Sequence, residues 1–256
     1  MIKTETKNGV TTITLNRPEK RNALTGEMID GLGAAVEAAE ANADCRCLVL
    51  TGAGDHFAAG RDLGDADKHT PLADVMAYDE AYASIFQRLR RSAKPSVSVV
   101  RGYAVAGGFT LSMGCDFVLA DRTAKFGALE MRGGFPAAVN SAVLSHLVGP
   151  RQALELLLSD GIFDADHLYR IGLINRLAAD AGELAEMADA FTAGLVRLDP
   201  IAVSLTKETQ RAAGAMPLAD ALVMGKQLNS LLMTSGKIDE AAEIYAAAKA
   251  AKSADS

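Results

Sequence analysis

The chain has 256 residues, of which 49% are hydrophobic and 23% are charged, and its formal net charge is −6. This length is sufficient for one large hydrophobic core, or for a large domain with a smaller appendage. The acidic balance, the absence of Trp and an aromatic content of 5% argue against a nucleic-acid or anionic-membrane partner.

Strands and helices are predicted to alternate over the first two thirds of the chain. Short apolar runs predict strands, a helical period of apolar residues predicts helices, and the glycine-containing segments at 102–108 and 127–134 predict a turn and a loop. In chain order we predict a strand at 10–15, a helix at 28–41, strand 47–51, helix 74–91, strand 96–101, a helix from about 107 to 114, strand 117–120, helices 139–147 and 151–158, and a last strand at 174–177.

The C-terminal part is predicted to contain helices only. It is rich in Ala from Glu183 onward, and Pro200 and Pro217 are placed to begin new helical segments. Strands that alternate with helices, followed by helices alone, indicate an α/β core with a helical tail. We assign residues 1–195 to the core and 196–256 to the helical region, whose helices are expected to serve packing or assembly.

The cysteines and histidines predict neither a disulfide framework nor a metal site. Three cysteines without framework spacing are typical of core thiols in a reducing cytoplasm, and Cys45 and Cys47, two apart on a predicted strand, are expected to share a face. No apolar signal region or membrane-spanning run is present, so we expect a cytoplasmic protein without a membrane partner. The histidines, too scattered for metal ligation, are His56, His69, His146 and His167.

Two glycine-containing turns concentrate small residues, which let a ligand approach the backbone. The first contains Gly60 and the second contains Gly107 and Gly108. A helix that begins near Gly107 leaves its first N–H groups unpaired and exposes the positive end of its dipole, which suits an oxyanion. Either feature alone is more often a plain turn, and the second is not a dinucleotide fingerprint because a third glycine at the required spacing is missing.

A series of short motifs accompanies these turns. In order they are LNRPEKRNAL at 15–24, LTG at 50–52, FAAGRDL at 57–63, GYAVAGG at 102–108, GCD at 114–116, AKFG at 124–127, LVG at 147–149 and IGLIN at 171–175. Together they resemble the crotonase family, also called the enoyl-CoA hydratase/isomerase family, over nearly the whole chain. The resemblance implies an α/β fold built as a spiral of ββα units, a C-terminal α-helical trimerisation region and an acyl-CoA thioester substrate.

The resemblance also implies how the substrate is bound. The backbone N–H groups of Arg61 and Gly107 would form an oxyanion hole for the thioester enolate, and such a donor is worth about 3 kcal/mol in a transition state. Coenzyme A is expected only as part of the substrate, with no further cofactor, in a homotrimer or dimer of trimers acting in fatty acid metabolism. On charge alone, the basic residues among the expected contacts form a solvated turn. The expected coenzyme A contacts are Lys20, Arg21 and Ala23, with Ala58 and Ala59 near the adenine.

The proton-transfer residues depart from the family pattern. Hydratases of the family resemble a two-carboxylate design, but here the first carboxylate position is Thr110 and the second is Glu130. Thr110 lies one helical turn from Gly107, and its hydroxyl can hold a water but cannot act as a general base at neutral pH. Glu130 is therefore the candidate acid/base, and partial burial is expected to raise its pKa. Without the resemblance, an ion pair of Glu130 with Arg122 or Arg132 is the simpler interpretation.

A single carboxylate favours isomerisation over hydration. It can take a proton from C2 of a 3-enoyl-CoA and return it to C4, whereas hydration needs a base for water and an acid for C2. We predict an enoyl-CoA isomerase ahead of a hydratase, which is a lyase. Other reactions of the same enolate stay open, as does a non-catalytic CoA-binding or assembly subunit, and the acyl group is not readable.

Other polar residues near the motifs are given structural roles. We predict that Asp62 fixes its loop, that His56 is exposed, and that Asn140 or Ser141 caps a helix N-terminus. A metal-like cluster beyond the first turn is interpreted as a mobile, solvated loop that is able to close over the acyl chain. Its members are Asp65, Asp67 and His69.

Overall fold

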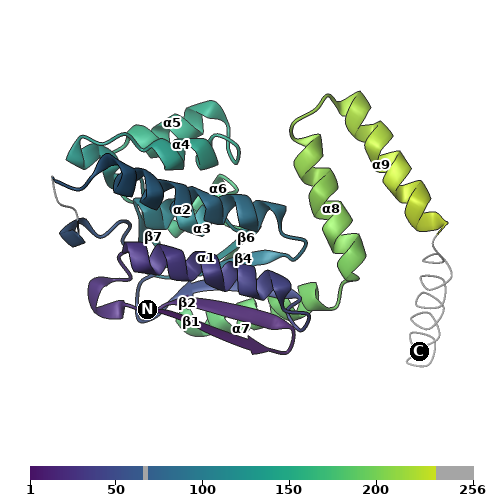
Figure 1. Ribbon diagram of the computed structural model, residues 1–256, viewed down its shortest axis with the longest axis horizontal. Coiled ribbons are helices and arrows are strands. Elements are labelled where there is room, and N and C mark those ends of the chain that lie inside the picture. Colours follow the sequence, from purple (N-terminus) through teal and green to yellow (C-terminus); the bar gives the residue numbers. More distant parts are fainter. Residues whose placement is uncertain (66–68, 235–256) are drawn as a thin grey trace. The chain divides into compact units, whose positions relative to one another are not determined.

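The computed structural model describes residues 1–65 and 69–234 (Figure 1). The chain divides into two compact units, Met1–Pro200 and Ile201–Ser256, close to the predicted boundary after residue 195. The predicted loop residue Asp67 and the end of the predicted helical region, from 235 onward, lie outside the described residues.

The first unit is built on a mostly parallel sheet, which confirms the predicted α/β core. In the described part of the chain this sheet has six strands, in the order β1-β2-β3-β4-β6-β9. β1 pairs antiparallel with β2 across a turn in which Asn8 and Gly9 have positive φ, and the other neighbours pair parallel. The strands are β1 (Ile2–Lys7), β2 (Val10–Leu15), β3 (Cys47–Gly52), β4 (Ser96–Val100), β6 (Phe117–Asp121) and β9 (Arg176–Ala178).

A smaller sheet occupies segments in which no strand was predicted. β5 (Tyr103–Val105) pairs parallel with β7 (Lys125–Gly127), and β7 pairs antiparallel with β8 (Phe163–Asp164). These strands are short and lie among glycines, so their sequence carries no strand pattern. The prediction of an unbroken turn at 102–108 is therefore wrong, because its middle residues are a strand.

Helices cover both faces of the main sheet. α1 and α2 pack side by side (Figure 1) and belong to the larger hydrophobic cluster, which includes Leu48 and Leu50, whereas α7 packs against Val49 and Val97. Because β3 is buried on both faces, it is a continuous apolar run. The helices are α1 (Gly26–Ala41), α2 (Leu72–Arg91), α3 (Gly107–Met113), α4 (Ala138–Leu144), α5 (Pro150–Leu158), α6 (Ala165–Arg170) and α7 (Ala181–Val196), with short 3₁₀ turns η1 (Pro18–Lys20), η2 (Leu63–Asp65) and η3 (Leu129–Gly133).

The two neighbouring cysteines do not share a face, contrary to the prediction. Cys45 precedes β3 and belongs to the larger cluster, whereas Cys47 lies in β3 and packs on the α7 side. Both are buried, and neither forms a disulfide within the described residues.

The second unit is described through two helices. α8 (Pro200–Ala213) begins at the predicted proline, and α9 (Leu218–Met233) has Pro217 as its N-cap residue. Among the described residues, no helix combines the length and apolar character that crossing a bilayer requires.

Candidate active site

The two glycine turns meet in the first unit. Ala58 N donates to Tyr103 O at 3.0 Å, and Val105 N donates to Ala58 O at 3.1 Å, so the turns lie edge to edge. Gly60 has a φ of +86°, and a Cβ there would lie 2.8 Å from Ala106 Cβ and 3.0 Å from Val105 O. Only glycine combines this left-handed backbone with such a close approach.

The N–H groups of Arg61 and Gly107 are brought together and left without protein acceptors. Leu24 N donates to Gly60 O at 2.7 Å and Asp62 N donates to Leu24 O at 2.9 Å, so Leu24 pairs with the residues flanking Arg61, whose own N–H points away from it. Gly107 is the first residue of α3, where N–H groups lack helical partners. Within residues 1–65 and 69–234 neither N–H donates to the protein, and a Cβ on Gly107 would lie 3.8 Å from Arg61 N.

A strained peptide precedes the second amide. Ala106 has a φ of 49°, a left-handed conformation that costs a non-glycine residue about 1–3 kcal/mol. Ala106 N donates to Gly127 O at 2.7 Å, and Ala106 O accepts from Phe109 N at 2.9 Å. The Tyr82 hydroxyl donates to Gly107 O. These bonds hold the first turn of α3 in place despite the strain.

Tyr82 stays neutral in this position. Its side chain is buried, and burial raises the pKa of Tyr82 above its ordinary value, an effect that the neighbouring Thr110 hydroxyl opposes. A neutral phenol can donate a hydrogen bond to a carbonyl, so Tyr82 on α2 holds the Gly107 carbonyl in place.

Glu130 is a partly buried carboxyl group with one oxygen in use. Its Oε1 accepts from Asn140 Nδ2 at 2.9 Å, whereas Oε2 is buried and has no hydrogen-bond partner within residues 1–65 and 69–234. Burial raises the pKa of Glu130, while hydrogen bonds from its own backbone and from Asn140 oppose the increase. The alternative ion pairs do not form, because Arg122 pairs with Asp166 and Arg132 donates to the carbonyl of Asp160.

Thr110 and Asn140 are two further buried polar residues near Gly107 and Glu130. Thr110 is 1% exposed, and within residues 1–65 and 69–234 its Oγ1 makes no hydrogen bond of normal geometry, although it lies close enough to the Tyr82 hydroxyl to affect the pKa of that group. The helix-cap prediction is wrong, because Ala137 is the N-cap residue of α4 and makes no side-chain cap bond. Asn140 instead bonds Glu130, and Ser141 Oγ donates to Ala137 O within its own helix.

The residues expected to contact coenzyme A lie on two adjoining segments. Ala59 N donates to Arg21 O at 3.0 Å, which joins residues 20–23 to residues 58–59. Lys20 is exposed, and the exposed Arg21 guanidinium lies 5.5 Å from the centre of the Tyr103 ring. The fold thus brings these segments together, and their role in binding stays a prediction.

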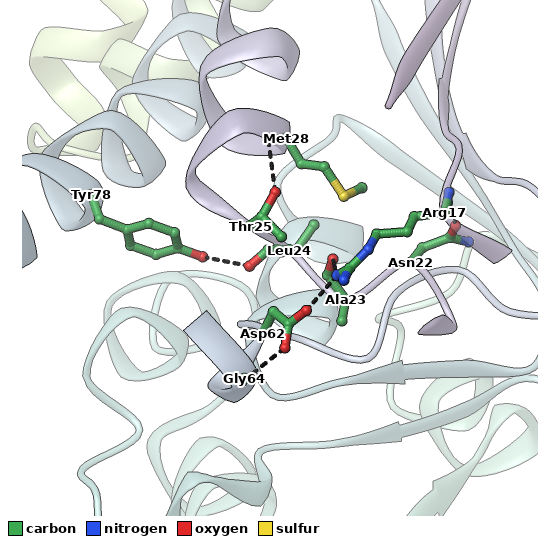
Figure 2. A network of polar contacts seen from close by, with 9 residues as sticks. All are labelled: Arg17, Asn22, Ala23, Leu24, Thr25, Met28, Asp62, Gly64 and Tyr78. Carbon is green, nitrogen blue, oxygen red and sulfur yellow. Dashed lines mark hydrogen bonds and ion pairs between the residues drawn. The ribbon is translucent and has the colours of Figure 1, made fainter. Parts of the chain in front are cut away.

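A polar network holds the loop that carries Arg61 (Figure 2). Arg17 pairs with Asp62, whose Oδ1 accepts from Gly64 N at 2.9 Å, which confirms that Asp62 fixes its loop. The hydrogen bond from Arg17 is the main cause that lowers the pKa of Asp62. Arg17 N in turn donates to Asn22 Oδ1 at 2.8 Å, so the network continues into the segment before α1.

His56 is half-buried, so the prediction that it is exposed is wrong. Its Nδ1 accepts from Tyr103 N at 3.2 Å, and the two rings lie 5.0 Å apart. Burial is the main cause that lowers the pKa of His56, which favours the neutral acceptor form. His56 therefore ties the two turns together.

An open cavity of about 410 Å³ lies beside Arg61, between the starts of α1 and α2. The Arg61 guanidinium lies 3.8 Å from the centre of the Tyr78 ring and 3.3 Å from Asp79 Oδ1. Tyr78 donates to Leu24 O at 3.3 Å, and burial raises the pKa of Tyr78 to about 12. The side chain of Arg61 is therefore held on α2, away from its own N–H.

Of the predicted metal-like cluster in the loop, His69 is exposed, and Asp67 lies outside the described residues. The described residues contain no group of three or more His, Cys, Asp or Glu side chains able to hold a metal ion.

Comparison with known proteins gives a consistent result. The sequence model of the family described as "Enoyl-CoA hydratase/isomerase" matches residues 5–252. A Thermus thermophilus protein, provisionally named an enoyl-CoA hydratase, is 35% identical over 242 residues, covering 94% of this chain and 95% of the relative. The 1,2-epoxyphenylacetyl-CoA isomerase of Escherichia coli is 31% identical over 250 residues, covering 96% and 95%.

Solved structures agree in fold. The crystal structure of an enoyl-CoA hydratase from Mycobacterium smegmatis has a TM-score of 0.89 to this chain, with 25% sequence identity and 95% of each chain covered. The similarity therefore extends over the α/β core and the C-terminal helical region.

Proposed function

The chain belongs to the enoyl-CoA hydratase/isomerase family, and from this premise we propose that it shifts the double bond of an enoyl-CoA through an enolate held by the Arg61 and Gly107 N–H groups. It is an enzyme of the hydratase/isomerase type. The observation that carries the finer assignment is Glu130, a carboxyl group whose buried Oε2 has no hydrogen-bond partner in the part of the chain that the structure describes.

The proposed reaction uses one base and two backbone donors. Glu130 Oε2 takes a proton from C2 of a 3-enoyl-CoA, and the C–H electron pair forms a C1–C2 double bond while negative charge moves to the thioester oxygen. The two N–H groups stabilise this charge where it develops. The protonated Glu130 then returns the proton to C4, and the electrons of the dienolate form the C2–C3 double bond, so atoms and charge balance.

Thr110 supports isomerisation ahead of hydration. Its hydroxyl occupies the position at which hydratases of the family have a carboxylate, and a hydroxyl is not a general base at neutral pH. The E. coli relative is named as an isomerase of a CoA thioester. Hydration is the second candidate, because two other relatives are named as enoyl-CoA hydratases and Glu130 can serve as base and then acid in sequence.

Coenzyme A binding is proposed along the joined segments 20–23 and 58–59, where exposed basic side chains lie near the partly exposed Ala23 and Ala59, whereas Ala58 is fully buried. Lys20 and Arg21 are able to meet phosphate groups. The cavity beside Arg61 adjoins only one of the two proposed donor residues, because Gly107 and Glu130 are not among the residues that line it.

Product analysis of purified protein in D₂O tests the proposal. We expect 3-hexenoyl-CoA to become 2-hexenoyl-CoA, with deuterium incorporated at C4 where solvent exchanges with Glu130 before reprotonation. Accumulation of 3-hydroxyacyl-CoA from a 2-enoyl-CoA, without double-bond movement, would favour hydration. Tight CoA binding without turnover or C2–deuterium exchange across a broad acyl-CoA panel would instead indicate a non-catalytic subunit.

We also propose that the helical region assembles the protein into a homotrimer or into a dimer of trimers. Large apolar side chains of α9, among them Leu218, Leu222 and Leu231, are more than half exposed. Such side chains on an amphipathic helix are typical of an interface. Light scattering coupled to size exclusion is expected to give a trimer or hexamer mass.

A further inference from the structure

Asn140 donates two hydrogen bonds from one amide group. It lies in α4 with 1% of its surface exposed, and its Nδ2 donates to Glu130 Oε1 at 2.9 Å and to Ala106 O at 3.3 Å. Both partners are acceptors, so the NH₂ end of the side chain must face them, and its two N–H groups are fully used. This fixes the amide orientation and leaves Oδ1 buried without a partner.

The Ala106 carbonyl belongs to the peptide group that contains the Gly107 N–H. A peptide group is planar, and in the trans form its C=O and N–H point in opposite directions. A hydrogen bond to Ala106 O therefore also restrains the direction of the Gly107 N–H. The restraint matters here because Ala106 has a strained φ of 49° and would otherwise favour another conformation.

The other bond of Asn140 distinguishes the two oxygens of Glu130. Oε1 is engaged by Nδ2, whereas Oε2 is buried without a partner and is the oxygen free to accept a proton. An amide donor stabilises the ionised carboxylate against its burial. Tyr82 is the titratable neighbour from α2, and Arg132 on the same 3₁₀ turn is directed to Asp160 O.

We propose that Asn140 is a positioning residue that aligns the acid/base carboxylate and one oxyanion donor with each other, and that it assigns proton transfer to Glu130 Oε2. This inference rests on the proposed function, in which Glu130 and the Gly107 N–H act on the thioester. One side chain then controls both halves of the chemistry from a helix that contributes no group to the substrate.

The first test replaces Asn140 by Leu, which has a similar volume and no donor. We expect kcat on an enoyl-CoA to fall about 10–100-fold, the effect of losing a hydrogen bond to a charged group, with KM changed by less than about 3-fold. The pH limb in which Glu130 ionises should move to higher pH, because the ionised form has lost a donor. Ser141→Ala is the matched control, since Ser141 bonds only its own helix, and it should leave both readouts unchanged.

The second test reads the oxyanion site without turnover. Acetoacetyl-CoA has an enolate that absorbs in the near ultraviolet, and N–H donors at the thioester oxygen favour that enolate. The fraction of bound enolate should fall in Asn140→Leu and stay at the wild-type value in Ser141→Ala. Wild-type enolate binding, kcat and pH profile in folded Asn140→Leu would overturn the inference.

Asn140→Asp covers the case in which the Leu variant does not fold. It keeps the shape but places a second carboxyl group against Glu130, so we expect a larger loss of kcat at neutral pH, with recovery as the new group is protonated. Wild-type kcat in Asn140→Asp would contradict the inference. If Glu130→Gln abolishes turnover while the Asn140 variants behave as wild type, the inference alone fails. If Glu130→Gln is fully active, the proposed function fails, and the enolate absorbance still tests the Ala106 contact.

Discussion

The two sides of the site differ in how their buried polar groups are satisfied. On the side of the Arg61 amide, Asn22 is fully buried, accepts from Arg17 N, and donates to Ala53 O at 3.0 Å and His56 O at 2.7 Å. Each end of this side chain has a partner. We call Arg17, Asn22 and Asp62 the anchored side.

On the side of the Gly107 amide, three buried side-chain atoms have no hydrogen-bond partner among the described residues. They are Thr110 Oγ1, Glu130 Oε2 and Asn140 Oδ1, and we call these residues the open side. Buried polar atoms without partners lower stability, so proteins retain them mainly where a ligand or reaction uses them. In the proposed mechanism the anchored side supplies stability and position, whereas the open side keeps hydrogen-bonding capacity for the substrate.

The largest effect is expected on the open side, from Glu130→Gln. Gln can still accept from Asn140 but cannot take a proton, so kcat should fall by about 10²–10⁴-fold, the range of a general acid–base residue. Thermal unfolding should occur at the same or a higher temperature, because a partly buried carboxyl group is removed. Full turnover of this variant on every enoyl-CoA that the wild type converts would contradict the role of Glu130.

Gly60→Ala tests the contact between the two sides. The new Cβ would meet Ala106 Cβ at 2.8 Å at a residue with positive φ, so the two amides must move apart. We expect about 10²–10³-fold lower kcat, the cost of one oxyanion donor, and about 1–3 kcal/mol less stability. Gly33→Ala in α1, where a Cβ meets nothing within 4 Å, is the control and should leave kcat unchanged.

Asn22→Ala should separate stability from chemistry on the anchored side. The substitution removes the hydrogen bonds to Ala53 O and His56 O, and it places alanine at a position with positive φ, which asparagine tolerates better. The free energy of unfolding should therefore fall by about 2–4 kcal/mol. Denaturant unfolding measures the loss, and kcat of the folded fraction should change little. A collapse of kcat with unchanged stability would reverse the comparison.

The smallest effect has the opposite sign. Thr110→Val replaces a buried hydroxyl without a partner by a methyl group, so the free energy of unfolding should stay the same or rise by up to about 1 kcal/mol. Turnover should decrease only if the substrate or a water uses the hydroxyl. Marked destabilisation in a thermal melt would show that the hydroxyl is satisfied in solution.

Much of the fold could be predicted because the spacing of apolar residues in the sequence reflects which faces of the helices and strands are buried. The inner strands and the long helices were predicted nearly at their observed positions, since their apolar residues follow the faces that they bury. β1 was missed because five of its six residues are exposed, and IKTETK contains a single apolar residue, too few to mark a buried face. β7 and β8 were missed because two or three residues are too few to show a period.

The part of the candidate site that consists of backbone N–H groups could be proposed from the sequence. Glycine marks close approach, so Arg61 and Gly107 could be proposed from their turns and the resemblance. Asn140 was misassigned because its role depends on the packing of α4 against α3, which joins it to Ala106 across 34 residues of sequence. His56 was misassigned for the same reason, since its partner Tyr103 is remote in sequence.

The side chain of Arg61 lies on Tyr78 and Asp79, while its N–H lies beside Gly107. Every amino acid except proline supplies an N–H, so the chemistry places almost no demand on the identity of this residue. The proposed mechanism therefore allows substitutions at position 61 that reshape the adjoining cavity. If the proposed role of the Arg61 N–H is right, substitutions at this position are expected to change substrate preference more than the reaction itself.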